Sequence, residues 1–226
     1  MDNLEKLLEL IKIFKYRGFE RGFEVLRKYL LGLYFLKPDD FPAPLTDNRV
    51  VKRDWINILE ERTHKLVGVE IGVHQGAHAE YLLENLDLKS LYLIDPYLNY
   101  DEYEETWHTG DFNRHERLAK QRLNHCGGIS FVKSMSNEAV DIIPNKLDFV
   151  YIDGNHDYKF VMQDILNYYP KLSKNGILAG HDYTHDWPGV MEAVDNFATD
   201  ENLDVNRDNG GDWYILKPPS GTARPL

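Results

Sequence analysis

The chain has 226 residues and a formal net charge of −11 at pH 7, and 42% of its residues are hydrophobic. This length and composition predict one globular domain with an extension and exclude a globally disordered chain. The negative charge argues against general duplex binding, which needs clustered Lys and Arg, so we expect no nucleic-acid partner. A single cysteine excludes an internal disulfide. No stretch is typical of a signal peptide or membrane helix, so we expect a cytoplasmic protein with no membrane partner.

The first 37 residues differ in charge from the rest, with eight Lys and Arg against five Asp and Glu. Apolar residues recur there at helical spacing, which predicts one or two amphipathic helices. Three prolines in residues 37–48 predict a linker. The predicted organisation is a helical arm with its linker at 1–48 and a main domain at 49–226. The apolar stripe of the arm would pack against the main domain, join two subunits as a homo-oligomer, or cover a substrate pocket. Its mixed polar face disfavours membrane attachment.

From residue 66 onward, short apolar runs alternate with helical stretches. We predict strands at 66–73, 91–95, 129–132, 147–153 and 176–182, and helices at 77–85, 115–125, 137–142 and 158–172. The segments 202–207 and 213–217 flank an Asp- and Gly-rich connection and predict a terminal antiparallel hairpin. This order predicts an α/β protein with a doubly wound, mainly parallel seven-stranded sheet.

Ligands of a doubly wound sheet bind beyond the carboxyl ends of its strands. The first predicted strand ends in the turn Glu70-Ile71-Gly72-Val73-His74-Gln75-Gly76, where Gly72 would let a ligand approach the backbone and Gly76 would open a helix. The turn lacks the third glycine of the dinucleotide fingerprint, which disfavours a nicotinamide-dependent oxidoreductase, and no Gly-Lys-Ser/Thr follows, which excludes a P-loop. Asp95 ends the second strand, where a carboxylate can bind ribose hydroxyls or cap a loop before proline.

Acids and histidines follow the fourth and fifth predicted strands. Asp153 and His156 come after the fourth, and His181 and Asp182 after the fifth. Because parallel strands end at one edge of a sheet, the four side chains can meet in one pocket, where two acids suit a divalent cation and a histidine suits proton abstraction. Either histidine alone is more often structural. A metal-dependent hydrolase would also use this set, but it would leave the glycine turn and the second strand end without a role.

Across residues 65–217 the chain resembles the class I S-adenosylmethionine-dependent methyltransferases. The motifs that carry the resemblance are the turn at 70–76, Asp95, and the segments 149–158 and 174–183. The resemblance implies a Rossmann-like fold and S-adenosylmethionine as cofactor. The residues it implies for cofactor binding are Glu70, Gly72, Val73, Gly76, Asp95, Ser134, Met135 and Asp153.

The segments 149–158 and 174–183 are similar to a branch that includes metal-dependent sugar O-methyltransferases of antibiotic biosynthesis. This similarity implies Asp153 and Asp182 as ligands of Mg²⁺ and His156 as the base. From their place at the strand ends we also expect Asp153 and His181 to take part in catalysis. The sugar enzymes tend to carry two acids where this chain has His181-Asp182, which leaves a metal-free or histidine-assisted site open.

The expected function is methylation of a hydroxyl on a small molecule or sugar. The aromatic and acidic residues within 97–124 would cover such an acceptor or form a solvated loop. The alternative from another class is a non-catalytic nucleoside-binding or assembly protein on the same fold, because fold alone does not establish activity.

Overall fold

The computed structural model describes residues 53–98, 111–208 and 211–219. The predicted N-terminal arm and linker, with the lid and oligomer interpretations attached to them, lie outside the described residues, as do residues 99–110 of the aromatic segment. Within the described part of the chain, no helix has the length and apolar character needed to cross a membrane.

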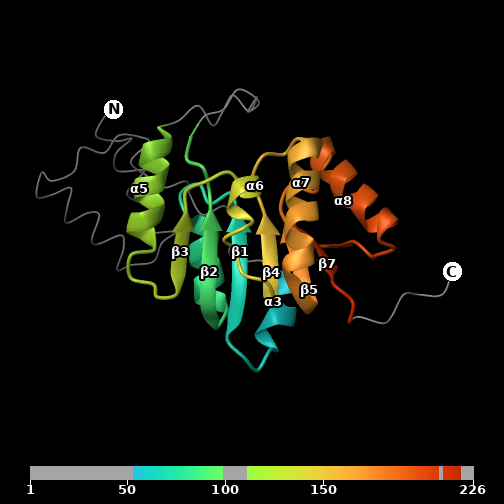
Figure 1. The fold of residues 1–226 in the computed structure, drawn as a ribbon, viewed down its shortest axis with the longest axis horizontal. Coiled ribbons are helices and arrows are strands. Elements are labelled where there is room, and N and C mark those ends of the chain that lie inside the picture. The colour runs from blue at the N-terminus through green and yellow to red at the C-terminus, as the bar shows by residue number, and fades with distance from the viewer. Residues whose placement is uncertain (1–52, 99–110, 209–210, 220–226) are drawn as a thin grey trace, which may run out of the picture. The chain divides into compact units, whose positions relative to one another are not determined.

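Seven strands form one sheet in the order β3-β2-β1-β4-β5-β7-β6 (Figure 1). They are β1 (Leu66–Ile71), β2 (Leu88–Ile94), β3 (Ile129–Val132), β4 (Leu147–Ile152), β5 (Leu172–Gly180), β6 (Asn206–Arg207) and β7 (Trp213–Leu216). The first five strands run parallel to one another, whereas β7 runs antiparallel to both β5 and β6. The predicted doubly wound sheet and its terminal antiparallel hairpin are confirmed.

Helices cover both faces of this sheet, and each face has its own apolar core. One core contains residues of α3 (Asp54–Glu60), α4 (Ala77–Asn85) and α5 (Phe112–Arg122), and the other contains residues of α6 (Ser136–Ala139), α7 (Tyr158–Tyr168) and α8 (Pro188–Asp200). β4 contributes alternately to the two cores, with Phe149 and Tyr151 in the first and Val150 and Ile152 in the second. Strands buried on both faces are rich in apolar residues throughout, so the sequence predicts β4 closely.

Some elements differ from the sequence prediction. The predicted helix 158–172 ends at Tyr168, because Pro170 cannot continue it, and a 3₁₀ turn η4 (Tyr169–Lys171) follows. β5 therefore begins at Leu172 rather than at residue 176. Neither α3 nor α8 was predicted, although Pro188 at the first position of α8 is a helix-start signal.

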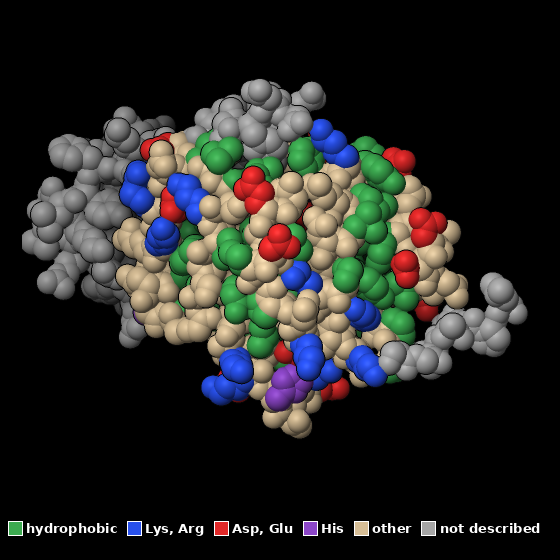
Figure 2. Space-filling model, in the orientation of Figure 1, with side chains coloured by type: hydrophobic (Ala, Val, Ile, Leu, Met, Phe, Trp, Pro, Cys, Tyr) green, Lys and Arg blue, Asp and Glu red, His purple; other side chains and the backbone are tan. Residues whose placement is uncertain are grey.

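Charge is distributed unevenly over the described surface. Figure 2 shows Lys and Arg side chains gathered at its lower edge, which Figure 1 identifies as the edge where β1, β2 and β4 begin. The predicted acids and histidines instead follow the strands at the edge where they end.

Candidate active site

A cavity of about 440 Å³ lies at the carboxyl ends of β1, β2, β4 and β5. Strand order reverses between β1 and β4, which is where sheets of this kind bind ligands. Most of the site residues predicted from the sequence line it: Glu70, Gly72, Val73, Asp95, Met135, Asp153, His156, His181 and Asp182. The parallel strands therefore bring segments more than a hundred positions apart to a single cavity.

Asp95 organises the turn after β1. Its Oδ2 accepts hydrogen bonds from the backbone N–H of Val73 at 3.0 Å and of His74 at 2.8 Å, and its Oδ1 accepts one from Tyr97 N–H at 2.8 Å. A carboxylate has about four acceptor positions, so one side chain can hold this loop and also serve a ribose hydroxyl. The loop-capping and ribose-binding interpretations of Asp95 are thus compatible.

The two glycines of the turn have structural roles. Gly72 has φ +88°, and a Cβ built on it would lie 1.9 Å from the backbone oxygen of Asp153, so the missing side chain permits the ends of β1 and β4 to approach. This contact by itself requires a glycine, and Gly72 also lines the cavity, where a ligand was expected to approach its backbone. Gly76, at φ +74°, precedes α4 and packs near Ala119, and it is not among the lining residues. The expected tight helix entry is observed, whereas the expected cofactor contact of Gly76 is not supported.

Ser136 lines the cavity where Ser134 was expected to do so. The Ser134 hydroxyl donates to Glu138 at 2.9 Å and stays outside the cavity, whereas the Ser136 hydroxyl donates to Asp164 of α7. Asp164 is only 4% exposed, and burial raises its pKa to about 7 despite the hydrogen bond from Ser136. Sequence reasoning missed Asp164, and its only local signal is a charged residue among the apolar positions of α7.

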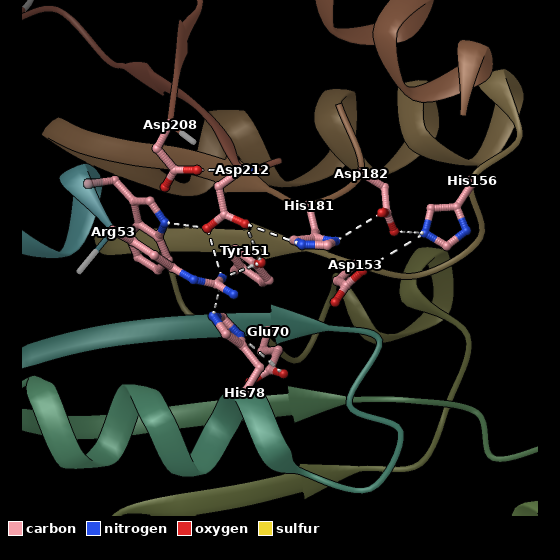
Figure 3. Close-up of polar contacts among 11 residues, drawn as sticks. Arg53, Glu70, His78, Tyr151, Asp153, His156, His181, Asp182, Asp208 and Asp212 are labelled. Carbon is pink, nitrogen blue, oxygen red and sulfur yellow. Dashed lines mark hydrogen bonds and ion pairs between the residues drawn. The ribbon is translucent and has the colours of Figure 1, made fainter. Parts of the chain in front are cut away.

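Four side chains at the ends of β4 and β5 form an acid–histidine cluster: Asp153, His156, His181 and Asp182 (Figure 3). The Nε2 atom of His156 lies 2.8 Å from Asp182 Oδ2 and 3.9 Å from Asp153 Oδ1, and His181 Nδ1 lies 3.0 Å from Asp182 Oδ1. The sequence prediction that these residues meet in one pocket agrees with this geometry.

The imidazoles and carboxylates of the cluster change each other's protonation. Burial alone would raise the pKa of Asp182, but the adjacent imidazoles of His156 and His181 outweigh it and hold the pKa well below its usual range. Burial likewise opposes the charged form of His181, yet Asp182, Asp153 and Asp212 outweigh it and raise its pKa to about 9. His181 is therefore a cation at neutral pH, which suits charge stabilisation better than proton abstraction.

Comparison with known proteins identifies the fold that holds this cavity. The model of a family described as "Methyltransferase domain" matches residues 69–183, from β1 to just beyond β5. The chain belongs to this family. It is 31% identical over 142 residues to an uncharacterised protein of Acanthamoeba polyphaga mimivirus, and the match covers 60% of each chain. The chain thus spans about 60% of the length of that relative.

Solved structures share the architecture. The O-methyltransferase NovP has 19% identity and a TM-score of 0.56, with 73% of this chain and 76% of NovP covered. A candidate methyltransferase of Streptococcus mutans, solved in complex with SAH, has 13% identity and a TM-score of 0.54, with 74% and 97% covered. At these identities the likeness shows the fold, which is that of the class I S-adenosylmethionine-dependent methyltransferases.

The methyltransferase domain has a donor set that fits a divalent cation. Ligand atoms of Asp153, His181 and Asp182 all lie within 4.8 Å of one another. Two carboxylates and an imidazole suit Mn²⁺ or Fe²⁺, whereas Mg²⁺ prefers oxygen ligands and would rely on the two aspartates. His181 was predicted as catalytic rather than as a ligand, and it would have to lose its proton to coordinate a metal.

Trp187 is a site residue of the methyltransferase domain that sequence reasoning missed. Its ring stacks on His156 with centroids 4.2 Å apart and planes 26° apart, and it lines the cavity. The stacking fixes the plane of the imidazole predicted to act as a base. Trp187 directly precedes α8, and because this helix was not predicted, Trp187 was not recognised as a site residue.

A second polar group, the arginine network, contains Arg53, Trp55, His78, Tyr151 and Asp212. Figure 3 labels four of them, all but Trp55, and His78 also lines the cavity. Asp212 Oδ2 accepts hydrogen bonds from Arg53 Nη1 at 2.7 Å and from Trp55 Nε1 at 2.9 Å, while the Tyr151 hydroxyl donates to Asp212 Oδ1 at 3.1 Å. Burial raises the pKa of Asp212 to about 6, against the opposing charge of Arg53. The network joins α3, β4 and the β6–β7 connection, and no sequence motif indicated it.

Proposed function

We propose that this chain uses S-adenosylmethionine to methylate a hydroxyl oxygen of a small molecule or sugar. The observation that carries the proposal is one cavity in which the turn after β1 and Asp95 face the acid–histidine cluster. The first end would hold the cofactor, and the second would hold the acceptor and take its proton. The NovP likeness supports oxygen as the methylated atom only by analogy of fold.

Methyl transfer from a sulfonium is an in-line displacement: a carbon–oxygen bond forms, the carbon–sulfur bond breaks, and its electron pair stays on sulfur. The chain must align the reacting atoms and exclude water. His156 Nε2 would accept the hydroxyl proton. It does so in the tautomer that carries the ring proton on Nδ1, and Asp182 Oδ2, 2.8 Å away, would stabilise the imidazolium that forms. Trp187 would keep the imidazole in plane during this change.

Asp153, Asp182 and His181 would hold a divalent cation. Such an ion would lower the pKa of the acceptor hydroxyl. We expect loss of methyl transfer after chelation and recovery on adding Mn²⁺ or Mg²⁺ to the wild type but not to Asp182→Asn. Full activity after chelation would remove the metal from the proposal and leave the histidine-assisted site.

The cofactor assignment is tested first, by calorimetric titration with S-adenosylhomocysteine. We expect binding by the wild type and at least about tenfold weaker binding by Asp95→Ala, because the loop and the ribose both lose their acceptor. Asp87→Ala is the matched control, since Asp87 precedes β2, is 73% exposed and, among the described residues, pairs with the exposed Lys65. No binding by the wild type would overturn the proposed function.

The direction of transfer is tested with labelled S-adenosylmethionine and a panel of sugars, phenols and amines. Transfer to hydroxyl compounds supports the proposal, whereas transfer confined to amines would overturn the oxygen assignment. Cofactor binding without transfer to any acceptor would favour the non-catalytic alternative.

A further inference from the structure

One face of α7 carries large apolar side chains that the described part of the chain leaves exposed. Tyr158, Met162 and Leu166 follow one another at intervals of four residues, so they lie on one face of the helix and form the α7 stripe. Tyr158 is 37% exposed, Leu166 is 57% exposed, and Met162 is partly buried. Ile142, in the turn after α6, is 68% exposed. Three of the five exposed large hydrophobic side chains among the described residues therefore gather here rather than scatter.

The other faces of α7 already have partners. Val161 and Ile165 pack in the apolar core, and Phe160 and Asp164 line the cavity. The stripe faces away from both. A partner that covered the stripe would therefore support a helix that forms part of the cavity wall.

The surface around the stripe is acidic. α7 contacts α6 on one side and α8 on the other. These three helices carry one exposed base, Lys159, and four exposed acids, Glu138, Glu192, Asp195 and Asp200. Figure 2 views the molecule from the side of these helices and shows hydrophobic side chains with Asp and Glu beside them. An apolar stripe in acidic surroundings fits an amphipathic helix with basic flanks.

The N-terminal arm of this chain has the matching chemistry. Residues 1–37 contain eight Lys and Arg against five Asp and Glu, so their net charge is positive where that of the three helices is negative. Leu4, Leu8 and Ile11 recur at helical spacing and predict an apolar stripe on the arm. Each stripe alone would expose apolar surface to water, and each has the charge that attracts the other.

The arm joins the domain on the opposite side of the sheet from α7. Arg53 is bonded to Tyr151 and Asp212 and directly precedes α3, whose apolar residues belong to the other core. The linker between the arm and Arg53 would span only roughly 20 Å on average. An arm of the same copy would have to pass round the edge of a three-layer domain within that span, whereas an arm of a second copy would not.

We propose that the N-terminal arm of a second copy docks on the α7 stripe, so that two copies exchange arms about a two-fold axis. The exchange covers both stripes at once, as expected of a symmetric dimer. Apolar contacts supply the affinity, and the opposite charges speed association and set the orientation. The inference concerns assembly and does not rest on the proposed function.

Sedimentation of the full chain tests the inference. We expect a dimer whose dissociation constant rises at least about tenfold in Leu166→Glu, because the substitution puts a charge into the apolar contact. Ile11→Glu should have the same effect from the arm. Leu216→Glu is the matched control, since Leu216 is 43% exposed but lies on β7, and its dissociation constant should change less than about twofold. Added salt should weaken the wild-type dimer by screening the opposite charges.

Mixing the two variants separates exchange between copies from damage to the fold. The mixed dimer keeps one intact contact, the arm of the Leu166→Glu copy on the stripe of the Ile11→Glu copy, so mixing should restore part of the association. A monomeric wild type, a dimer that Leu166→Glu leaves intact, or mixing without recovery would overturn the inference. A monomer whose α7 amides lose protection from hydrogen exchange in Ile11→Glu would show docking within one copy, and it would also overturn the inference.

Discussion

The acid–histidine cluster and the arginine network are neighbouring polar groups that the fold assembles differently. Members of the cluster come in two pairs at adjacent strand ends, and their side chains are about a tenth to a third exposed. In the network, Arg53 and Asp212 are 159 positions apart and are 11% and 1% exposed. We infer that the cluster, whose four members all line the cavity, serves the reaction, whereas the network, of which only His78 lines the cavity, holds the cavity in shape.

The largest expected effect lies in the cluster. His156→Gln removes the proposed proton acceptor, so we expect methyl transfer to fall about a thousandfold, within the range for general-base catalysis. The affinity for S-adenosylhomocysteine should change less than about twofold, since no cofactor contact is removed. Single-turnover transfer to an identified hydroxyl acceptor measures the first quantity and calorimetry the second. His185→Gln, an exposed histidine that does not line the cavity, is the control. Comparable rates in the two variants would contradict the assignment.

A substitution in the arginine network is expected to lower the stability of the folded chain. Arg53→Met leaves Asp212 buried without its cation, so we expect the free energy of unfolding to fall by about 3–5 kcal/mol in urea titrations. Lys65→Met breaks an exposed pair 3.4 Å long and should cost less than about 1 kcal/mol. Similar losses in both variants would remove the distinction between buried and exposed charges.

Asp164 is a buried acid that accepts a hydrogen bond from Ser136, whereas Asp212 accepts hydrogen bonds from Arg53, Trp55 and Tyr151. Its pKa is about 7 in the folded chain against an ordinary value of 3.8, so the folded state holds the proton more tightly. The resulting stability is complete below about pH 4 and is lost as the pH rises through about 7. Relative to Asp164→Asn, the unfolding free energy of the wild type should therefore fall by about 3–4 kcal/mol from pH 4 to pH 7.5. Parallel pH profiles for the two proteins would contradict this.

The smallest expected signal comes from Glu70, whose pKa responds to both polar groups: Asp153 of the cluster raises it and Arg53 of the network lowers it. Burial and nearby acids raise its pKa, and a bound ammonium group would lower it again, so ligand binding should release up to about one proton. Calorimetric titrations with S-adenosylhomocysteine in buffers of different ionisation enthalpy count that proton at about pH 6. Glu70→Gln should release none, and equal release by both proteins would place the proton elsewhere.

The sequence was most informative where the signal is local. Apolar runs closed by a polar residue or glycine predicted β1, β3 and β4 within two residues. The pairs after β4 and β5 predicted the cluster because parallel strands end together. It was less informative where neighbours decide the role. Gly76 and Ser134 occupy motif positions but do not line the cavity. Gly76 lies close to Ala119 at the start of α4, and the Ser134 hydroxyl donates a hydrogen bond to Glu138.

The sequence by itself determined the alternation of strands and helices, and with it the edge of the sheet that carries the site. Only the tertiary structure decided that Arg53, His78 and Asp212 touch, that Asp164 is buried beneath Ser136, and that Trp187 stacks on His156. Periodicity and turn chemistry act between residues a few positions apart, so they leave a record in the sequence. Contacts between distant segments depend on strand order and on how the hairpin and α3 dock, and single residues carry no local sign of them.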